Sequence, residues 1–325
     1  MRIAITGGSG SLGTALVRRL TREGADRIVV FSRDEQRRAR MQAEFSWHPG
    51  VRVYAGDVRD EPRLEDLFYG CDAVIHAAAR KVVAAHPDEP REMYLTNIGG
   101  TLNVIQAASR AGVRKLLLVS SDKAVRAENC YGVSKAMAEH LVIAANAQTF
   151  PRNLKCSVIR YGNVLASNGS VLVLWRQLAA AGQPLPLSDP QMTRFWLVLP
   201  RAVDFVLRAL GDMRGGEVFV PRLPAAPLTT LAQALVECPQ FQAIGIRPGG
   251  EKVHEEMLSA AEIVRARVRN GFYVVPPFQH LHMWDNTPWL GEPVPEGFTY
   301  RSDTWEWQLA VEGMRDLLDD AEEAK

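Results

Sequence analysis

The sequence predicts an α/β fold built around one parallel, doubly wound sheet. In the first half of the chain, short apolar runs alternate with helical stretches, which is the pattern of strand–helix–strand crossover units. The apolar runs are rich in β-branched residues and bounded by Gly or Asp, as expected of strands that are buried on both faces. The predicted strands are residues 2–6, 27–32, 51–55, 73–77, 115–120 and 154–161.

Helices are predicted between these strands, at residues 12–23, 97–111 and 131–149. Beyond residue 161, prolines and glycines become frequent and the helical patterns shorten, apart from a helix at 200–210. We therefore expect a sheet domain of residues 1–161, to which residues 197–215 return. Residues 162–196 and 216–325 are expected to form a smaller C-terminal lobe over the carboxyl ends of the strands, where open α/β sheets bind ligands.

Composition excludes several classes of partner. The 325 residues carry a formal net charge of +1, which favours neither nucleic acid nor a membrane surface. No run of about 18 apolar residues is present, so no membrane span is expected. A strand at residues 2–6 leaves no room for a signal peptide, and we expect a cytoplasmic protein. Four cysteines stand far apart without metal-ligand spacing, which predicts reduced thiols and no metal: Cys71, Cys130, Cys156 and Cys238.

A glycine-rich loop of the form G-x-x-G-x-x-G follows the first predicted strand and opens the first helix. Glycine allows the tight turn and lets the backbone approach a pyrophosphate, while the helix N-terminus supplies N–H donors. This context predicts a dinucleotide site, and hence a Rossmann-like first domain. The residues predicted to line the site are Gly7, Ser9, Gly10, Ser11, Leu12 and Gly13.

The end of the second strand indicates which dinucleotide is bound. An acidic residue there would bind the adenine-ribose hydroxyls of NAD, whereas Ser32 and Arg33 can bind the 2′-phosphate of NADP. Asp34 keeps NAD as an alternative, but NADP is the predicted cofactor. Further cofactor contacts are predicted at Asp57 and Val58, near the adenine, and at Ala77, Ala78 and Ala79.

Tyr131 and Lys135 are four residues apart at the start of a predicted helix, so both side chains project from one face. We expect the lysine ammonium to favour the phenolate and thereby to lower the pKa of the tyrosine. Such a tyrosine can take a proton from a sugar hydroxyl while a hydride leaves the same carbon for nicotinamide. Both residues are also predicted to contact the cofactor.

Ser121, Asp122 and Lys123 follow the fifth strand. Ser121 can donate a hydrogen bond to the reacting oxygen. Asp122 and Lys123 form an acid–base pair that simple alcohol oxidation does not need, but that a second proton transfer does. A ketone at carbon 4 of a hexose acidifies the proton on carbon 5, so one residue can remove that proton while the other protonates the leaving hydroxyl on carbon 6. The alternative is a surface ion pair in a loop.

Eight segments together resemble UDP-N-acetylglucosamine 4,6-dehydratases of the extended short-chain dehydrogenase/reductase superfamily, over nearly the whole chain. The Asp122–Lys123 pair and residues 192–195 are more specific to that family than the glycine loop is. The segments are TGGSGSLG at 6–13, SRDE at 32–35, SDKA at 121–124, YGVSK at 131–135, RYGNV at 160–164, MTRFW at 192–196, GGEVFVP at 215–221 and EKVHEEM at 251–257.

The resemblance implies a Rossmann domain with a small nucleotide-sugar lobe, and NADP that is recycled within each turnover. It implies dehydration of a UDP-hexosamine, with UDP-N-acetylglucosamine favoured, to a 4-keto-6-deoxy sugar. Members with tyrosine at the Tyr131 position include enzymes that also invert carbon 5, and a homo-oligomer is expected. Tyr131 and Lys135 would serve the oxidation, and Asp122 and Lys123 the elimination. Substrate contacts are implied at Lys81, Asn163, Thr193, Arg194, Arg247 and Glu251.

The chain departs from the family pattern at four places that flank the expected pocket: RKVVA at 80–84, RAE at 126–128, RPGGEK at 247–252 and WEWQL at 305–309. The exact sugar and the outcome at carbon 5 therefore stay open. A nucleotide-sugar 4-epimerase needs the Tyr–Lys pair but no Asp–Lys pair, and it remains an alternative, as does a dehydratase that stops after elimination. A non-catalytic NADP-binding regulator is the alternative from another class, since fold does not fix function.

Overall fold

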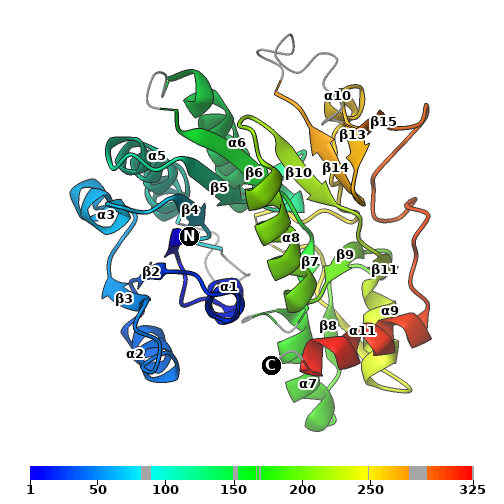
Figure 1. The fold of residues 1–325 in the computed structure, drawn as a ribbon. Coiled ribbons are helices and arrows are strands. Elements are labelled where there is room, and N and C mark those ends of the chain that lie inside the picture. Colours follow the sequence, from blue (N-terminus) through cyan, green and yellow to red (C-terminus); the bar gives the residue numbers. More distant parts are fainter. Residues whose placement is uncertain are drawn as a thin grey trace.

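The computed structural model describes residues 1–81, 89–148, 153–165, 167, 170–247, 249–277 and 291–323. A central sheet of ten strands runs through this part of the chain (Figure 1). In spatial order its strands are β3 (Val51–Ala55), β2 (Arg27–Ser32), β1 (Arg2–Thr6), β4 (Ala73–His76), β5 (Lys115–Val119), β6 (Lys155–Ile159), β10 (Val218–Pro221), β14 (Phe272–Val275), β13 (Arg267–Arg269) and β15 (Glu292–Pro293).

The strands from β3 to β10 are all parallel, and β14, β13 and β15 continue the sheet with antiparallel pairing. The order β3-β2-β1-β4-β5-β6 is that of a doubly wound dinucleotide-binding sheet. The predicted Rossmann-like α/β fold is therefore confirmed, and each of the six predicted strands forms within a few residues of its expected bounds.

Helices cover both faces of this sheet (Figure 1). On one face lie α3 (Glu61–Phe68), α5 (Gly100–Arg110) and α6 (Cys130–Gln148), whose apolar residues share a core with β4, β5 and β6. On the other face α1 (Ser11–Arg22) packs against α8 (Leu199–Asp212). Because α8 comes from the second half of the sequence, the chain returns to the first domain at this point.

The central sheet continues beyond residue 216, where the smaller lobe was expected to begin. Strands β10, β13, β14 and β15 all come from the region assigned to the smaller lobe, yet they extend the central sheet. The reason is tertiary: β10 pairs with β6 and β14 pairs with β10, which buries these short apolar strands on both faces. The sequence does not indicate this pairing, because a run of four apolar residues is too short to show the periodicity of a strand or a helix.

The smaller lobe is built around two minor sheets. Strands β7 (Asn163–Val164), β9 (Thr193–Leu197) and β11 (Ala225–Pro227) form one, and β8 (Leu185–Leu187) pairs with β12 (Phe241–Ala243) in the other. Its helices are α7 (Val171–Ala180), α9 (Leu228–Leu235) and α11 (Val311–Glu323). They enclose a separate apolar core around Trp175, Trp196 and Met314.

Helices α2 (Glu35–Glu44) and α3 of the first domain were not predicted from the sequence, and neither were α7, α9 and α11 of the smaller lobe. Helix α2 buries only Met41, so it lacks an apolar stripe, and Asp34 caps its first turn. Helix α3 is short and begins at a cap formed by Asp60. The predicted helix at 97–111 is preceded by α4 (Pro90–Met93) and a π-helical turn, Tyr94–Gly99. The remaining short elements are a 3₁₀ turn, Asp122–Ala124, and α10 (Ala260–Ile263).

A buried ion-pair network ties β6 to α6 and α10. The Arg160 guanidinium lies 2.6 Å from a Glu139 oxygen and 2.9 Å from a Glu262 oxygen. Burial alone would raise the pKa of Glu262, but Arg160 outweighs it and lowers that pKa to about 2. The Ser120 hydroxyl also donates to Glu139, so the network reaches the end of β5.

Within the described residues, no helix is long and apolar enough to cross a membrane. The same part of the chain contains no group of His, Cys, Asp and Glu side chains that could hold a metal ion. The four cysteines are free thiols, two buried and two exposed.

Candidate active site

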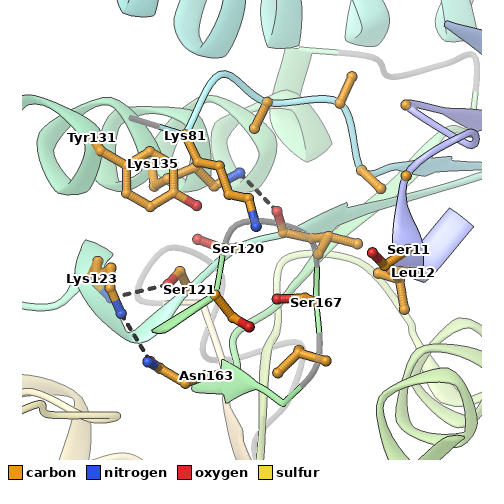
Figure 2. Close-up of a pocket in the computed structure, with 18 of the residues that line it drawn as sticks. Ser11, Leu12, Lys81, Ser120, Ser121, Lys123, Tyr131, Lys135, Asn163 and Ser167 are labelled. Carbon is orange, nitrogen blue, oxygen red and sulfur yellow. Dashed lines mark hydrogen bonds between the residues drawn. The ribbon is translucent and has the colours of Figure 1, made fainter. Parts of the chain in front are cut away.

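The carboxyl ends of the parallel strands open into a cavity of about 900 Å³. The glycine loop, the ends of β2 and β3, the residues after β4 and β5, the start of α6 and the smaller lobe all line it. Figure 2 shows Ser11 and Leu12 on one side of this cavity, and Lys123 on the opposite side. A cavity at this end of a doubly wound sheet is where such folds bind their ligands.

The glycine loop is packed too tightly for any other residue type. A Cβ atom on Gly7 would lie 2.7 Å from the Ala78 Cα, and one on Gly13 would lie 2.3 Å from the Gly8 Cα. Gly7 also has a φ of +65°, which favours glycine. Gly10 is the N-cap of α1 and offers no side-chain oxygen to the first N–H groups of the helix. This loop and helix start fit a pyrophosphate.

Basic side chains gather at the end of β2. Arg33 and Arg37 both line the cavity and are about half exposed, and Arg33 lies 3.4 Å from an Asp57 oxygen. The Asp34 carboxylate accepts a hydrogen bond from the Arg37 N–H at 2.9 Å, so its place is that of a helix cap. The Ser32 hydroxyl accepts from Ser9 at 2.7 Å.

A buried histidine, His76, helps to position the segment after β4. His76 lies between two threonine hydroxyls, 2.6 Å from Thr6 and 3.0 Å from Thr101. Burial lowers the pKa of His76 to about 3, so the ring stays neutral at physiological pH. The Thr6 hydroxyl also accepts from the Ala78 N–H. The alanines at 77–79 are thereby placed along the cavity wall.

Asn97, from the π-helical turn, positions the neighbouring Lys81. Its side chain makes two hydrogen bonds with the Arg80 backbone, at 2.7 and 2.9 Å, and a third with Ser134 of α6 at 2.8 Å. Lys81 points into the cavity as a result (Figure 2). Burial, aided by the nearby Lys123, lowers the pKa of Lys81.

Tyr131 and Lys135 both reach the cavity from the first turns of α6. The Lys135 ammonium donates to the Val119 carbonyl at 2.7 Å, and burial lowers the pKa of Lys135 to about 8. Contrary to the sequence-based expectation, the pKa of Tyr131 is raised to about 12. Burial of the phenol outweighs the opposing effect of a nearby cation, and the lysine that lowers this pKa is Lys123, not Lys135 as expected.

The Asp122–Lys123 pair is not a surface ion pair. Asp122 is fully buried, and the Lys123 ammonium lies 3.0 Å from its Oδ1, 3.2 Å from the Asn163 Oδ1 and 3.3 Å from the Glu255 Oε1. Ser121 also donates to Asp122, at 2.8 Å. Burial alone would lower the pKa of Lys123, but the two carboxylates raise it above its usual range. The resting pair therefore holds one ammonium and one carboxylate.

The predicted substrate residues of the smaller lobe divide into two groups. Asn163, Arg194, Arg247 and Glu251 line the cavity together with Lys81, but Thr193 does not. The Thr193 hydroxyl instead lies 2.6 Å from Ser302 and 2.9 Å from His254, inside the lobe. A role for Thr193 in packing the lobe therefore replaces the substrate contact that the resemblance implied. Asp122 likewise does not line the cavity, and its carboxylate contacts Lys123 and Ser121, which do.

Comparison with known proteins identifies the family. A family model described as "Polysaccharide biosynthesis protein" matches residues 3–277. The chain belongs to this family. A relative from Campylobacter jejuni named UDP-N-acetylglucosamine 4,6-dehydratase (inverting) is 38% identical over 309 residues, which cover 93% of this chain and 92% of the relative. A relative from Rickettsia typhi named UDP-glucose 4-epimerase is 38% identical over 282 residues, 84% of this chain and 82% of the relative.

Solved structures agree with this polysaccharide biosynthesis family. The structure of Pen from Bacillus thuringiensis has a TM-score of 0.90 at 30% identity, covering 98% of this chain and 97% of Pen. DesIV from Streptomyces venezuelae, described as a dTDP-glucose 4,6-dehydratase with NAD and TYD bound, has a TM-score of 0.67 at 23% identity and shares the fold. The resemblance inferred from the eight segments is confirmed.

Four cavity or wall residues of this family member received no role from the sequence: Arg37, Asn97, Lys252 and Glu255. For Arg37, a signal was present, because it lies in the first turn of a helix capped by Asp34. Lys252 and Glu255 belong to the segment 251–257 that carried the resemblance, yet nothing local indicates that they face Lys123. Asn97 is marked only by its π-helical turn, a feature common at functional sites.

We predict that Gly13→Ala weakens dinucleotide binding at least tenfold. The added methyl group would meet the Gly8 backbone and push the loop away from the helix start, at a cost of about 1–3 kcal/mol in unfolding free energy. Fluorescence titration with the dinucleotide and chemical denaturation measure the two effects. Gly211→Ala is the matched control, because nothing lies within 4 Å of the added atom. Equal dinucleotide affinities of the two variants would contradict a role of the glycine loop in binding the dinucleotide.

Proposed function

We propose that this protein is an NADP-dependent nucleotide-sugar 4,6-dehydratase, a carbon–oxygen lyase that acts on a UDP-hexosamine, with UDP-N-acetylglucosamine as the first candidate. The observation that carries the proposal is the Lys123 ammonium, paired with the buried Asp122, in the same cavity as Tyr131 and Lys135. An oxidoreductase that acts on one carbon alone has no use for this second acid–base pair.

The relatives support the substrate class. Two Campylobacter relatives, 37% and 38% identical to this chain, are named UDP-N-acetylglucosamine 4,6-dehydratase (inverting). A nicotinamide dinucleotide is supported by neighbours of the same fold that were solved with NAD and a nucleotide or nucleotide sugar. The glycine loop, Ser32 and Arg33 would hold the dinucleotide, which when bound would supply the hydride-transfer chemistry that links carbon 4 and carbon 6.

The residues of the chain supply the proton transfers. Tyr131 takes the proton of the carbon 4 hydroxyl, which Ser121 orients by a hydrogen bond. The resulting ketone acidifies the proton on carbon 5. The Asp122–Lys123 pair removes that proton and protonates the hydroxyl that leaves carbon 6 as water. Lys123 lines the cavity, and Asp122 exchanges protons through Lys123 and Ser121. Because Tyr131 starts as a neutral phenol of raised pKa, its deprotonation is helped by the Lys123 ammonium.

We predict that Lys123→Ala lowers the dehydration rate by about 10²–10⁴-fold, the usual contribution of a general acid–base group. Asp122→Asn should behave similarly, because it removes the charge that pairs with Lys123. Loss of the carbon 6 oxygen from UDP-N-acetylglucosamine is followed by mass spectrometry, and NADP affinity by fluorescence. Arg126→Ala, which removes an exposed side chain of the same loop, is the control. Near-normal dehydration by both site variants would refute the elimination roles.

The choice of NADP rests on Ser32, Arg33 and Arg37 at the end of β2, and on the use of Asp34 as a cap. A guanidinium suits a 2′-phosphate because it stays charged and bonds two oxygens at once. With Asp34 holding the first turn of α2, the end of β2 presents a hydroxyl and two cations. This set favours a phosphate over the two ribose hydroxyls of NAD.

We predict that Arg33→Ala weakens NADP binding by about 10–100-fold, the equivalent of one charge-assisted hydrogen bond. Arg37→Ala should act in the same direction. NAD binding should hardly change, because NAD lacks the phosphate. Isothermal titration with both dinucleotides makes the comparison, and Arg40→Ala, an exposed arginine of the same helix outside the cavity, is the control. Equal losses for NADP and NAD would show that Arg33 does not bind the phosphate.

A second candidate, nucleotide-sugar 4-epimerase, is favoured by one observation, the 38% identical relative from Rickettsia typhi with that name. Isotopes separate the two reactions. In a dehydratase, deuterium placed on carbon 4 moves to carbon 6 and water is lost. In an epimerase it stays on carbon 4 and no water is lost.

We predict transfer of deuterium from carbon 4 to carbon 6, with uptake of solvent deuterium at carbon 5 and inversion there. The measurement is NMR and mass spectrometry of the product in D₂O, without stoichiometric release of reduced cofactor. A product unsaturated between carbons 5 and 6 would indicate an enzyme that stops after elimination. Retention of the label on carbon 4 would identify an epimerase, and no turnover of any nucleotide sugar would favour a regulator.

We also propose that the protein forms a homo-oligomer through α5 and α6. Helix α6 presents apolar side chains on its outward side as well as toward the core, and an exposed apolar face is often covered by a partner. Its outward side chains Val133 and Met137 are 54% and 46% exposed, beside Leu102 of α5 and Tyr94 of the π-helical turn. Light scattering that reports a monomer at micromolar concentration would contradict this.

A further inference from the structure

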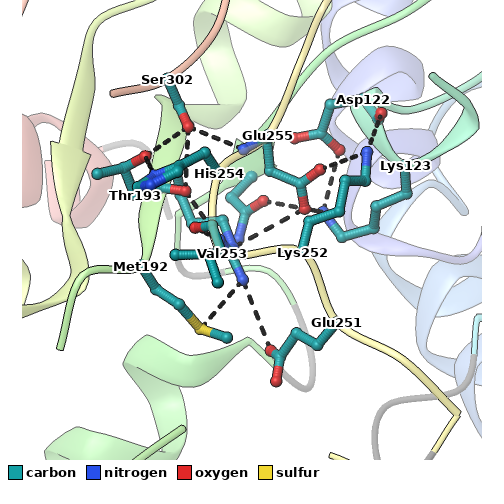
Figure 3. Close-up of polar contacts among 12 residues, drawn as sticks. Asp122, Lys123, Met192, Thr193, Glu251, Lys252, Val253, His254, Glu255 and Ser302 are labelled. Atoms are coloured by element: carbon teal, nitrogen blue, oxygen red, sulfur yellow. Dashed lines mark hydrogen bonds and ion pairs between the residues drawn. The ribbon is translucent and has the colours of Figure 1, made fainter. Parts of the chain in front are cut away.

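A group of four charged side chains, of which Arg194 and Glu255 are buried, lies where the smaller lobe meets the end of β5, and we call it the Glu255 cluster (Figure 3). Its members are Lys123, Arg194, Lys252 and Glu255. Glu255 is 2% exposed, and the roles described above make no use of it. A carboxylate so deeply buried needs partners, and the identity of those partners indicates its role.

Three cations lie close to the Glu255 carboxylate. Its Oε1 lies 3.3 Å from the Lys123 ammonium and 3.9 Å from the Arg194 Nε, while its Oε2 lies 2.9 Å from the Lys252 ammonium. Its backbone is held as well, because the Glu255 N–H donates to the Ser302 hydroxyl and the Ser302 N–H donates to the Glu255 carbonyl, both at 2.9 Å. Ion pairs thus hold the carboxylate next to Lys123, and hydrogen bonds hold the backbone that carries it.

Lys252 connects Glu255 to the turn that carries Lys123. Its ammonium donates to the carbonyls of Asp122 and Val125, at 3.2 and 2.7 Å. These carbonyls belong to the 3₁₀ turn Asp122–Ala124 and the residue after it. Lys252 thus binds the backbone of the turn, and Glu255 pairs with the side chain of Lys123.

The charges around Lys123 come from several elements. Asp122 lies on the same turn, the Asn163 amide on β7, Glu255 and Arg194 in the smaller lobe, Tyr131 on α6, and Lys81 after β4. Asp122 and Glu255 favour the ammonium, whereas burial and Arg194 oppose it. Burial would raise the pKa of Glu255, but Lys123, Arg194 and Lys252 lower it, so Glu255 is ionised.

We propose that Glu255 is a positioning residue of the elimination step, which holds the Lys123 amine beside Asp122 and toward the sugar. This inference rests on the proposed dehydratase function. Glu255 acts through Lys123, and no bond to Glu255 forms or breaks. Because the segment 251–255 also carries Glu251, which lies 3.8 Å from Arg247 at the cavity wall, the same stretch of the lobe reaches both the substrate site and Lys123.

The test is Glu255→Gln, which keeps the size of the side chain and removes its charge. Dehydration should slow by up to roughly 10²-fold, as expected when a reacting group is misplaced by about 1 Å. Oxidation at carbon 4 should slow much less than dehydration, because Glu255 affects Tyr131 only through Lys123. In quench-flow mass spectrometry, a 4-keto sugar that still carries its carbon 6 oxygen should therefore accumulate.

The pH dependence gives a second readout that a purely structural role would not move. Removing the negative charge beside Lys123 lowers the pKa of its ammonium, by roughly 1–3 units. In a plot of dehydration rate against pH, the part of the curve that depends on the protonation of Lys123 should move to lower pH by that amount. This holds whether Lys123 donates or accepts the proton. Glu255→Asp keeps the charge, so it should retain the wild-type pH dependence and recover part of the rate.

The matched control is Glu256→Gln, the neighbouring glutamate. Glu256 pairs at 2.9 Å with the exposed Arg126, away from Lys123, so its loss should change neither the rate nor the pH profile. Unfolding free energy and NADP affinity are measured for every variant.

A Glu255→Gln variant with the wild-type dehydration rate and pH profile would overturn the inference. So would an equal loss of carbon 4 oxidation, since that would indicate a general structural role, and so would a Glu255→Asp variant with the pH dependence of Glu255→Gln. If wild-type protein itself releases no water from the sugar, the proposed function fails first and the inference fails with it. Wild-type dehydration with an unaffected Glu255→Gln variant would overturn the inference alone.

Discussion

The need to compensate one partly buried ammonium organises the junction between the sheet and the smaller lobe. The Lys123 side chain is 31% exposed, at the cavity wall, and a charge that is largely withdrawn from water is costly unless it is paired. Of the two carboxylates that pair with Lys123, Asp122 is its neighbour in the same turn. Glu255 lies 132 positions later in the chain and reaches Lys123 only in the folded protein. The lobe segment around residues 251–255 is therefore bound to the end of β5 by charge as well as by packing.

The parallel sheet makes that junction chemically useful. Because its strands point the same way, the segments after β1, β2, β4 and β5 reach one edge of the sheet, and the cavity opens there. Each segment is held by buried polar contacts that do not themselves meet a ligand. His76 and Thr6 hold the alanines after β4, Asn97 holds the backbone beside Lys81, and Glu139 holds Ser120 next to Ser121. The reacting groups thus stand on an inflexible frame, which is what precise proton transfer needs.

Burial also sets the charge states with which the site begins. Tyr131 is a neutral phenol, and Lys135 has a pKa of about 8, so the ammonium that stays charged most firmly in the cavity is that of Lys123. The same desolvation that raises the pKa of the phenol strengthens the attraction between Lys123 and its two carboxylates. The oxidation and elimination groups are therefore coupled through Lys123.

The sequence by itself determined the features that depend on near neighbours in the chain. The six parallel strands, the glycine loop, the hydroxyl and arginine after β2, and the Asp122–Lys123 and Tyr131–Lys135 pairs all follow from local composition and from fixed spacing on a strand or helix. The family segments were sufficient to recognise the dehydratase resemblance. Asp34 was ambiguous from the sequence, and its cap hydrogen bond was needed to explain it.

Only the tertiary structure decided what depends on distant contacts and on solvent exclusion. Strands β10 and β14 join the main sheet through pairing that short apolar runs do not encode locally. Thr193 turns toward Ser302 and His254 instead of the cavity, and Glu255 turns toward Lys123. The pKa of Tyr131 rises although a lysine lies one helical turn away, because desolvation of the phenol depends on the packing of the whole site. Spacing along a chain gives direction and proximity, but burial is a property of the folded molecule.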